Sequence, residues 1–126
     1  MVNDLDRERF SKAWFGEWAP DPPVFGWATE LLNDAIRDQP DAAWDLILVL
    51  VERAPHDDAL GWVGAGPLED LLCEHGPVFI GRAEVIANGY ERFRKSLARV
   101  WGSSRMEPGV YERMCQAAPG ARGERP

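Results

Sequence analysis

The stretch Leu60–His75, LGWVGAGPLEDLLCEH, constrains the fold of this chain more than any other part of the sequence. Its glycines predict a flexible turn, and Pro67 follows them directly. Proline at the first position of a helix loses nothing, because its missing amide hydrogen would be unpaired there. We therefore expect Gly66 to cap a helix that begins at Pro67, with the carboxylate of Glu69 reaching back to the capping amide. The apolar residues that follow at helical spacing, and that predict the face turned toward a core, are Leu68, Leu71 and Leu72.

A second segment, residues 41–54, is apolar on nearly every face and predicts the central helix of the fold. Its large apolar side chains are Trp44, Leu46, Ile47, Leu48, Val49, Leu50 and Val51. A helix that is apolar all round is buried all round. The same run of leucine, isoleucine and valine is compatible with a buried strand. The alanines before it and the lack of a second strand-like run favour the helix.

Proline and glycine divide the rest of the chain into further helical segments. Apolar residues at helical spacing predict helices over residues 5–19, 24–39, 78–87, 90–101 and 108–117. In the second of these, Asp21 is the expected cap. Its expected inward stripe consists of Val24, Trp27, Ala28, Leu31 and Ala35.

Together these segments predict an all-α fold, a compact irregular bundle of about six or seven short antiparallel helices. The alternation also resembles stacked HEAT-like helical hairpins, although the sequence shows no repeat period. We expect a single helical domain over residues 1–118. Residues 119–126 should form a disordered tail, because their glycine, proline and arginine offer nothing to bury.

The run GWVGAGPLEDLL resembles a signature of one protein family. It follows the helix that contains Trp44, and Phe93, Leu97 and the pair Val100–Trp101 come after it. This arrangement is similar to a family of small bacterial all-helical proteins of uncharacterised function, with an "AAGPLEDLL … L … VW" signature. The resemblance extends over about residues 41–101. It implies a helical fold and brings no catalytic or cofactor residue with it.

The charge of the chain is strongly asymmetric. Residues 1–76 hold 16 acidic and 5 basic side chains, whereas residues 77–126 hold 5 acidic and 9 basic ones, within a net charge of −7. An acidic surface repels nucleic acid and membrane headgroups and attracts basic proteins. No apolar run reaches the about 18 residues that span a bilayer, and the charged N-terminus does not resemble a secretory signal. We therefore expect a cytoplasmic protein without membrane contact.

The residue types that carry catalysis are present but poorly arranged for it. His56–Asp57 resembles the dyad of metal phosphohydrolases, yet only His75 remains as a further histidine ligand. Cys73 and His75 are two residues apart, so on a helix their side chains diverge. The glycines at residues 64–66 lack the lysine of a phosphate-binding loop. Without a secretion signal, Cys73 and Cys115 should be free thiols. We expect no enzyme activity, no cofactor and no metal.

A non-enzymatic, acidic protein-binding module is the function that these observations favour. A stoichiometric inhibitor or immunity-type protein would cover a basic partner surface with carboxylates. The expected carboxylates are Glu30, Asp34, Asp38, Asp57 and Asp58. Trp18 and Trp62 are the expected exposed aromatic anchors. Four other tryptophans are assigned to the core, at positions 14, 27, 44 and 101.

Two alternatives remain open. The first is a structural or adaptor subunit of a larger assembly, which would use Trp18, Trp62 and apolar surface. The second is a small-ligand or nucleic-acid site on the basic stripe Arg92, Lys95 and Arg99, which follow one another at helical spacing. The plainer interpretation of that stripe is a solvated helix face that balances the acidic first half, and the overall acidity disfavours nucleic acid.

Overall fold

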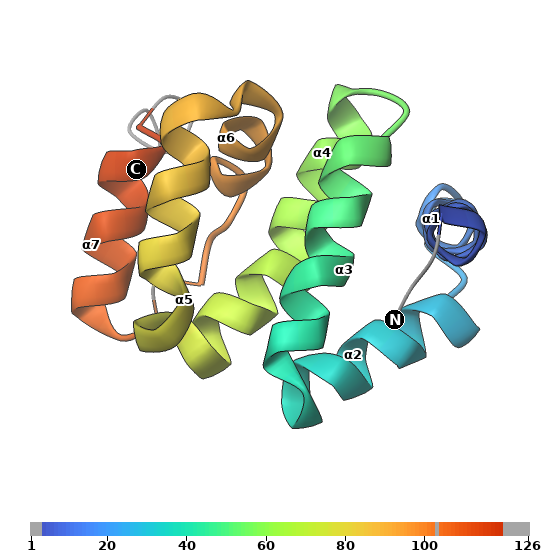
Figure 1. Cartoon of the computed structure of the whole chain (residues 1–126), viewed down its shortest axis with the longest axis horizontal. Helices are drawn as coiled ribbons and strands as arrows, with labels where there is room; N and C mark the ends of the chain where they lie inside the picture. Colours follow the sequence, from blue (N-terminus) through green and yellow to red (C-terminus); the bar gives the residue numbers. More distant parts are fainter. Residues whose placement is uncertain (1–3, 103, 120–126) are drawn as a thin grey trace.

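In the computed structural model the described residues are 4–102 and 104–119, and they contain helices and no strand. In chain order the helices are α1 (Asp4–Trp18), α2 (Trp27–Asp38), α3 (Pro40–Arg53), α4 (Asp57–Val63), the π-helical turn η1 (Gly64–Leu68), α5 (Glu69–Gly89), α6 (Glu91–Leu97) and α7 (Pro108–Ala117) (Figure 1). The predicted all-α bundle is confirmed. Residues 120–126, which hold nearly all of the expected tail, lie outside the described residues.

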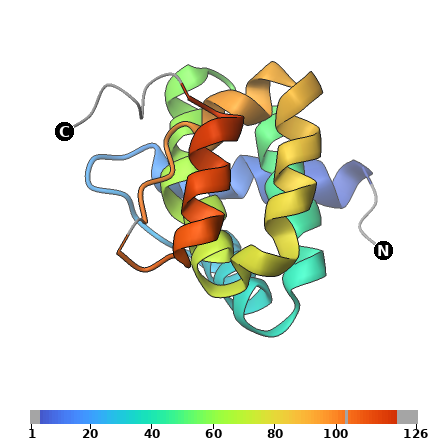
Figure 2. The ribbon, with the colours of Figure 1, turned by 90° about the vertical axis from the view of Figure 1, so that its left-hand side faces the viewer.

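Helix α3 stands in the middle of the molecule, with α1 and α2 at one end and α7 at the other (Figure 1). Seen from the side, the later turns of α5 run beside α7 (Figure 2). The side chains of Ile47, Leu50 and Val51 on α3 are 0% exposed and belong to one continuous apolar cluster. The central position predicted for residues 41–54 is therefore correct, although Leu48 is only partly buried.

The predicted turn at residues 64–66 and the predicted cap at Gly66 are wrong, because the chain stays helical from α4 through η1 into α5. The glycines serve close packing instead. A Cβ on Gly64 would lie 1.9 Å from the carbonyl oxygen of Ser96, and one on Gly66 would lie 2.7 Å from the ring of Trp18. The wider π-helical turn accommodates Pro67, which has no amide hydrogen to donate inside a helix.

The residues after α3 contain the start of α4. His56 caps this helix, since its Nδ1 accepts a hydrogen bond from the amide of Ala59 at 3.1 Å. Gly76 and Pro77 do not end α5, which is kinked just before them. His75 leaves helical geometry, with φ −133° and ψ 24°, and α5 continues to Gly89. The ring of His75 is held at this kink by a hydrogen bond from Nε2 to the carbonyl of Ile36, 2.7 Å away.

The inward face of α2 differs from the prediction. Ala28 is buried as expected, but Val24, Trp27 and Leu31 are 68%, 49% and 47% exposed. The residues that α2 buries are Ala28, Thr29, Leu32 and Ile36. The buried face of α2 is thus rotated about the helix axis relative to the predicted buried face.

Two of the four tryptophans assigned to the core are in fact exposed. Trp14 and Trp44 are buried as predicted, whereas Trp27 and Trp101 are 49% and 43% exposed. The helix predicted over residues 90–101 would include Trp101. The observed helix α6 ends at Leu97, so Trp101 lies outside it.

Candidate functional site

The start of α2 is set by a side chain from the preceding helix. Glu17, near the end of α1, accepts hydrogen bonds from the amides of Ala28 and Thr29 at 3.0 and 2.9 Å. It also accepts one from the Thr29 hydroxyl at 2.6 Å. A Cβ on Gly26 would lie only 3.0 Å from the Glu17 carboxylate, so glycine leaves room for this contact. Glu17, and not the predicted Asp21, therefore satisfies the first amides of α2.

The environment of the Glu17 carboxylate favours its charged form. Partial burial alone would raise its pKa, but hydrogen bonds from the Thr29 side chain and from the amides of Gly26, Thr29 and Ala28 outweigh this effect. The pKa of Glu17 is consequently held below its ordinary value. A charged carboxylate at the N-terminus of α2 also suits the positive end of the helix dipole.

Aromatic rings fix the corner between α1 and α2. The ring of Trp18 stacks on Trp14, with centroids 4.8 Å apart, and lies 5.0 Å from the ring of Phe25. The indole Nε1 of Trp18 donates to the hydroxyl of Thr29 at 3.2 Å. Trp18 is therefore partly buried against the core, as is Trp62, whose ring meets His56 edge-on. Both predicted anchors, Trp18 and Trp62, therefore contribute to packing.

One exposed face of α2 combines apolar and acidic side chains; we call it the α2 face and define it as Trp27, Glu30, Leu31, Asp34 and Asp38. Each of these residues is exposed. Because successive helical residues are about 100° apart, the five fall within an arc of about 100°. Trp27 and Leu31 form its apolar half. Glu30 lies between them in the chain, and Asp34 and Asp38 follow toward the C-terminal end. Phe25 and Val24, exposed by 57% and 68%, lie just before it in the chain.

A small cavity opens beside the apolar half of the α2 face, where α1, α2 and α3 meet. Its volume is about 260 Å³, and it is lined by Asp6, Arg9, Phe10, Trp27, Leu31 and Leu46. The guanidinium carbon of Arg9 lies 5.6 Å from the centre of the Trp27 ring, within the range of a cation–π contact. This contact holds the exposed indole at the edge of the cavity.

The five predicted carboxylates do not form one patch. Glu30, Asp34 and Asp38 lie on α2, whereas Asp57 and Asp58 begin α4, beyond the far end of α3 (Figure 1). With about 1.5 Å of rise per residue, the 14 residues of α3 separate the two groups by roughly 20 Å. The sequence-predicted site is thus two sites, and only the α2 group lies beside exposed aromatic and aliphatic side chains.

Cations from the second half of the chain pair with other carboxylates of the first half. Arg82 contacts Asp41 at 3.1 Å, and Lys95 contacts Asp57 at 3.3 Å. Arg105 contacts Glu69 at 2.8 Å. On the α2 face, Asp34 and Asp38 contact the neighbouring Arg37 at 3.1 and 3.2 Å. The ion pairs of these two aspartates are thus exposed and confined to their own helix.

The basic stripe on α6 and the residues after it serves the fold. Arg92 donates through Nε to the carbonyl of Val51 at 3.0 Å, and through Nη2 to Ala54 at 2.8 Å, so it closes the end of α3. Lys95 is paired with Asp57, as described above. The guanidinium of Arg99 lies over Gly61, where an added Cβ would come within 3.2 Å of Cζ. These contacts agree with the structural interpretation of the stripe.

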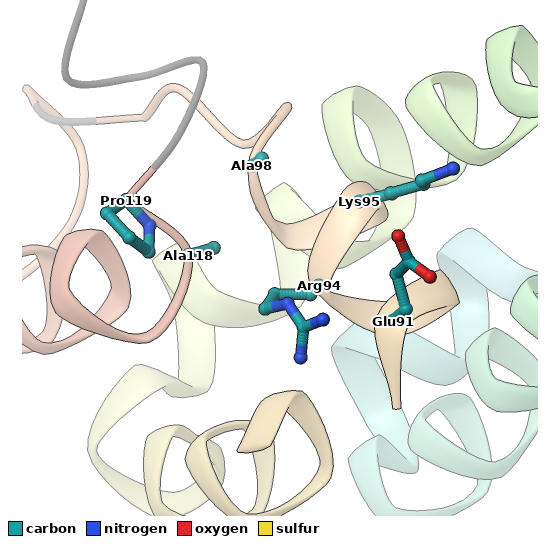
Figure 3. A pocket seen from close by; sticks show the side chains of 6 residues that line it. All are labelled: Glu91, Arg94, Lys95, Ala98, Ala118 and Pro119. Atoms are coloured by element: carbon teal, nitrogen blue, oxygen red, sulfur yellow. The ribbon is translucent and has the colours of Figure 1, made fainter. Parts of the chain in front are cut away.

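A second cavity, of about 280 Å³, lies between α6 and the end of α7. Its lining residues are Glu91, Arg94, Lys95, Ala98, Ala118 and Pro119 (Figure 3). Arg94 and Lys95 point in different directions, so their charges do not converge on one point (Figure 3). Arg94 also donates to the carbonyl of Ala87 at 2.8 Å. The positive charge in this cavity is therefore too dispersed to favour an anionic ligand.

The remaining side chains that could act as nucleophiles or metal ligands are far apart or already hydrogen-bonded. Cys73 and Cys115 are free thiols, as predicted, and burial raises the pKa of Cys73, which lowers its reactivity as a nucleophile. Glu69, expected to cap a helix, instead accepts a hydrogen bond from the amide of Trp101 at 2.8 Å. Among residues 4–102 and 104–119, no three metal-ligating side chains lie close enough to hold an ion. Within the same ranges, no helix combines the length and apolar character needed to cross a bilayer.

Comparison with known proteins gives a family and no individual relative. No curated protein and no solved structure matches this chain. A family model described as "Family of unknown function (DUF6869)" matches residues 17–121. The match agrees with the resemblance to an uncharacterised family that the sequence suggested, and it includes Trp18, Phe25, the α2 face and η1. Since it extends over most of the chain, this protein belongs to DUF6869, a family of unknown function.

Proposed function

We propose that this protein is a protein-binding module that uses the α2 face to cover a basic, partly apolar surface of another protein. One observation carries the proposal: exposed tryptophan and leucine side chains share a helix face with three exposed carboxylates. Isolated exposed apolar residues are ordinary, but a cluster of them bordered by charge is typical of an interaction site. Tryptophan is also the residue most enriched among the side chains that dominate binding energy.

The chemistry of the partner follows from charge. Residues 1–76 hold 16 acidic and 5 basic side chains, and this half of the chain includes the whole α2 face. Asp34 and Asp38 form ion pairs with exposed Arg37, at 3.1 and 3.2 Å. Exposed pairs contribute little stability, so incoming lysine or arginine side chains can share these carboxylates at small cost. A stoichiometric inhibitor or immunity-type protein fits this chemistry, because such a protein masks a basic active cleft.

The test is affinity capture of the tagged protein from a lysate of its source, washed at about 50 mM and at about 500 mM salt. The wild type is compared with Asp34→Asn/Asp38→Asn. The matched control, Asp57→Asn/Asp58→Asn, removes the same charge at the other end of α3. We expect a basic protein that wild type and control retain at low salt, that high salt releases, and that Asp34→Asn/Asp38→Asn fails to retain.

Two results would contradict the proposal. Equal capture by both double variants would show that the α2 carboxylates are not special. A salt-resistant set of several proteins, bound equally by all variants, would favour the structural or adaptor subunit instead.

A further inference from the structure

We infer that the cavity lined by Phe10, Trp27, Leu31 and Leu46 is an anchor pocket that receives one large apolar side chain of a basic protein segment. This inference rests on the proposed function and adds how the partner is recognised. The four named walls are aromatic or aliphatic, and Asp6 and Arg9 complete the lining. Trp27 and Leu31 are also 49% and 47% exposed, so the pocket opens directly onto the α2 face.

The size of the cavity favours a side chain over a whole small molecule. Its volume of about 260 Å³ is below the range of about 300–1,000 Å³ that is typical of sites for drug-sized ligands. Protein interfaces, in contrast, gain much of their affinity from a single aromatic or aliphatic side chain inserted into a pocket of the partner. Phe10 and Leu46 are 3% and 8% exposed, so the inner walls are already packed and preformed.

The carboxylates of the α2 face determine which residues should flank the apolar anchor residue in the partner segment. At about 1.5 Å of rise per residue, Asp34 and Asp38 lie about 4.5 and 10.5 Å beyond Leu31 along the helix. A helical partner segment bound along α2 would meet them with lysine or arginine about three to seven residues from its anchor. The recognised motif is thus one large apolar residue with basic residues one or two helical turns away.

Other occupants fit the site less well. A second copy of this chain would add a second set of α2 carboxylates to the same interface, and an interface between two acidic faces is electrostatically unfavourable. Residues 120–126, GARGERP, are basic but contain no large apolar side chain to fill the pocket. A basic segment of another protein satisfies both the apolar cavity and the acidic face.

The experiment selects binders from a displayed library of random 16-residue peptides against the intact wild-type chain. Dissociation constants of the enriched peptides are then measured by fluorescence anisotropy at low salt. Two variants change the pocket: Trp27→Ala removes a wall, and Leu31→Trp narrows the opening from an exposed position. Trp101→Ala is the matched control, because Trp101 is also an exposed tryptophan, at 43%, and does not line the cavity.

We expect the enriched peptides to share a large apolar residue with lysine or arginine three to seven positions away. Their affinity should fall about tenfold or more with Trp27→Ala and Leu31→Trp, and should stay within about twofold of wild type with Trp101→Ala. Replacing the anchor residue of a peptide by alanine should cause a loss of the same size. These results would support the pocket.

The outcomes separate the pocket from the proposed function. Basic peptides without a common apolar residue, weakened only by Asp34→Asn/Asp38→Asn, would overturn the pocket and leave the α2 face as a binding surface. Peptides insensitive to both the α2 carboxylates and Trp27 would overturn both. A dimer in sedimentation that Trp27→Ala dissociates would make a second copy the occupant and would also overturn the inference.

Discussion

Glu17 shows how one carboxylate can organise a surface that it does not itself form. It stands on α1 and satisfies the first amides of α2, with oxygen–nitrogen distances of 3.0 and 2.9 Å. The position of the first residues of α2, including Trp27, therefore depends on a hydrogen-bond acceptor ten residues earlier in the chain. Neighbouring Trp18 holds the same junction through Thr29. The α2 face is thus attached to the core at its N-terminal end.

We predict that Glu17→Gln lowers the free energy of unfolding at pH 7 by about 1–2 kcal/mol, because it removes a charged cap of α2. The effect should depend on pH. The pKa of Glu17 is lowered in the folded protein from an ordinary value of 4.5, so its contribution is fully present above about pH 4.5 and is lost as the pH falls through the folded pKa. Urea unfolding of both proteins at pH 7 and pH 3 measures this difference.

Glu8→Gln is the control for this prediction. Glu8 is on the same helix, is exposed, and pairs with Lys12 at 3.5 Å. Such a pair on a helix surface contributes only about 0.3–0.5 kcal/mol. A loss of equal size for Glu8→Gln and Glu17→Gln would mean that general charge, and not the cap, stabilises the junction.

At the scale of helices, replacing glycine by alanine should have opposite effects on stability at two positions. A Cβ on Gly64 would lie 1.9 Å from the carbonyl oxygen of Ser96, so Gly64→Ala must separate η1 from α6. We predict a loss of at least about 2 kcal/mol, as for an overpacked core. Nothing lies within 4 Å of a Cβ on Gly81, so Gly81→Ala should stabilise α5 by about 0.5–1 kcal/mol.

Thermal unfolding of the two variants beside wild type would measure both effects in one experiment. The melting temperature should fall with Gly64→Ala and rise with Gly81→Ala. If Gly64→Ala left the melting temperature unchanged, the close approach of η1 and α6 would be wrong.

These helices also show what the sequence predicts and where it fails. The existence of most helices follows from the spacing of apolar residues, and α7 matches its predicted bounds of 108–117. Residues 64–66 are predicted as a turn with a helix starting at Pro67, because glycine is typical of turns and proline of the first helical position. Here tertiary contacts from Ser96 and Trp18 require glycine inside a continuous helix. Those contacts are remote in sequence, so no local pattern reveals them.

The candidate site was predicted only in part, for a related reason. Glu30, Asp34 and Asp38 share one face by helical spacing alone. Trp27 and Leu31 fit an inward stripe nearly as well as Leu32 and Ile36 do, because α2 is apolar over a wide arc. Which side turns inward depends on the cap by Glu17 and on packing against α3. Spacing within α2 cannot supply this information.

At the scale of the whole molecule, the acidic and basic halves meet through specific pairs. Contacts such as Arg82 to Asp41 and Lys95 to Asp57, at 3.1 and 3.3 Å, join the second half of the chain to the first. Asp41 lies just after α2 and Asp57 at the other end of α3, whereas the ion pairs of Asp34 and Asp38 are with Arg37 of the same helix. The net charge of −7 is therefore distributed so that negative charge stays available beside exposed apolar side chains.

The most direct test of the α2 face compares two tryptophans in one measurement. Trp27 and Trp101 are similarly exposed, at 49% and 43%, and lie in different parts of the fold. Hydroxyl-radical oxidation of the protein, alone and bound to the captured basic partner, would report the accessibility of each ring. The α2 face predicts that binding slows oxidation of Trp27 several-fold and leaves Trp101 unchanged. Protection of Trp101 with Trp27 unchanged would place the interface elsewhere and contradict the proposed function.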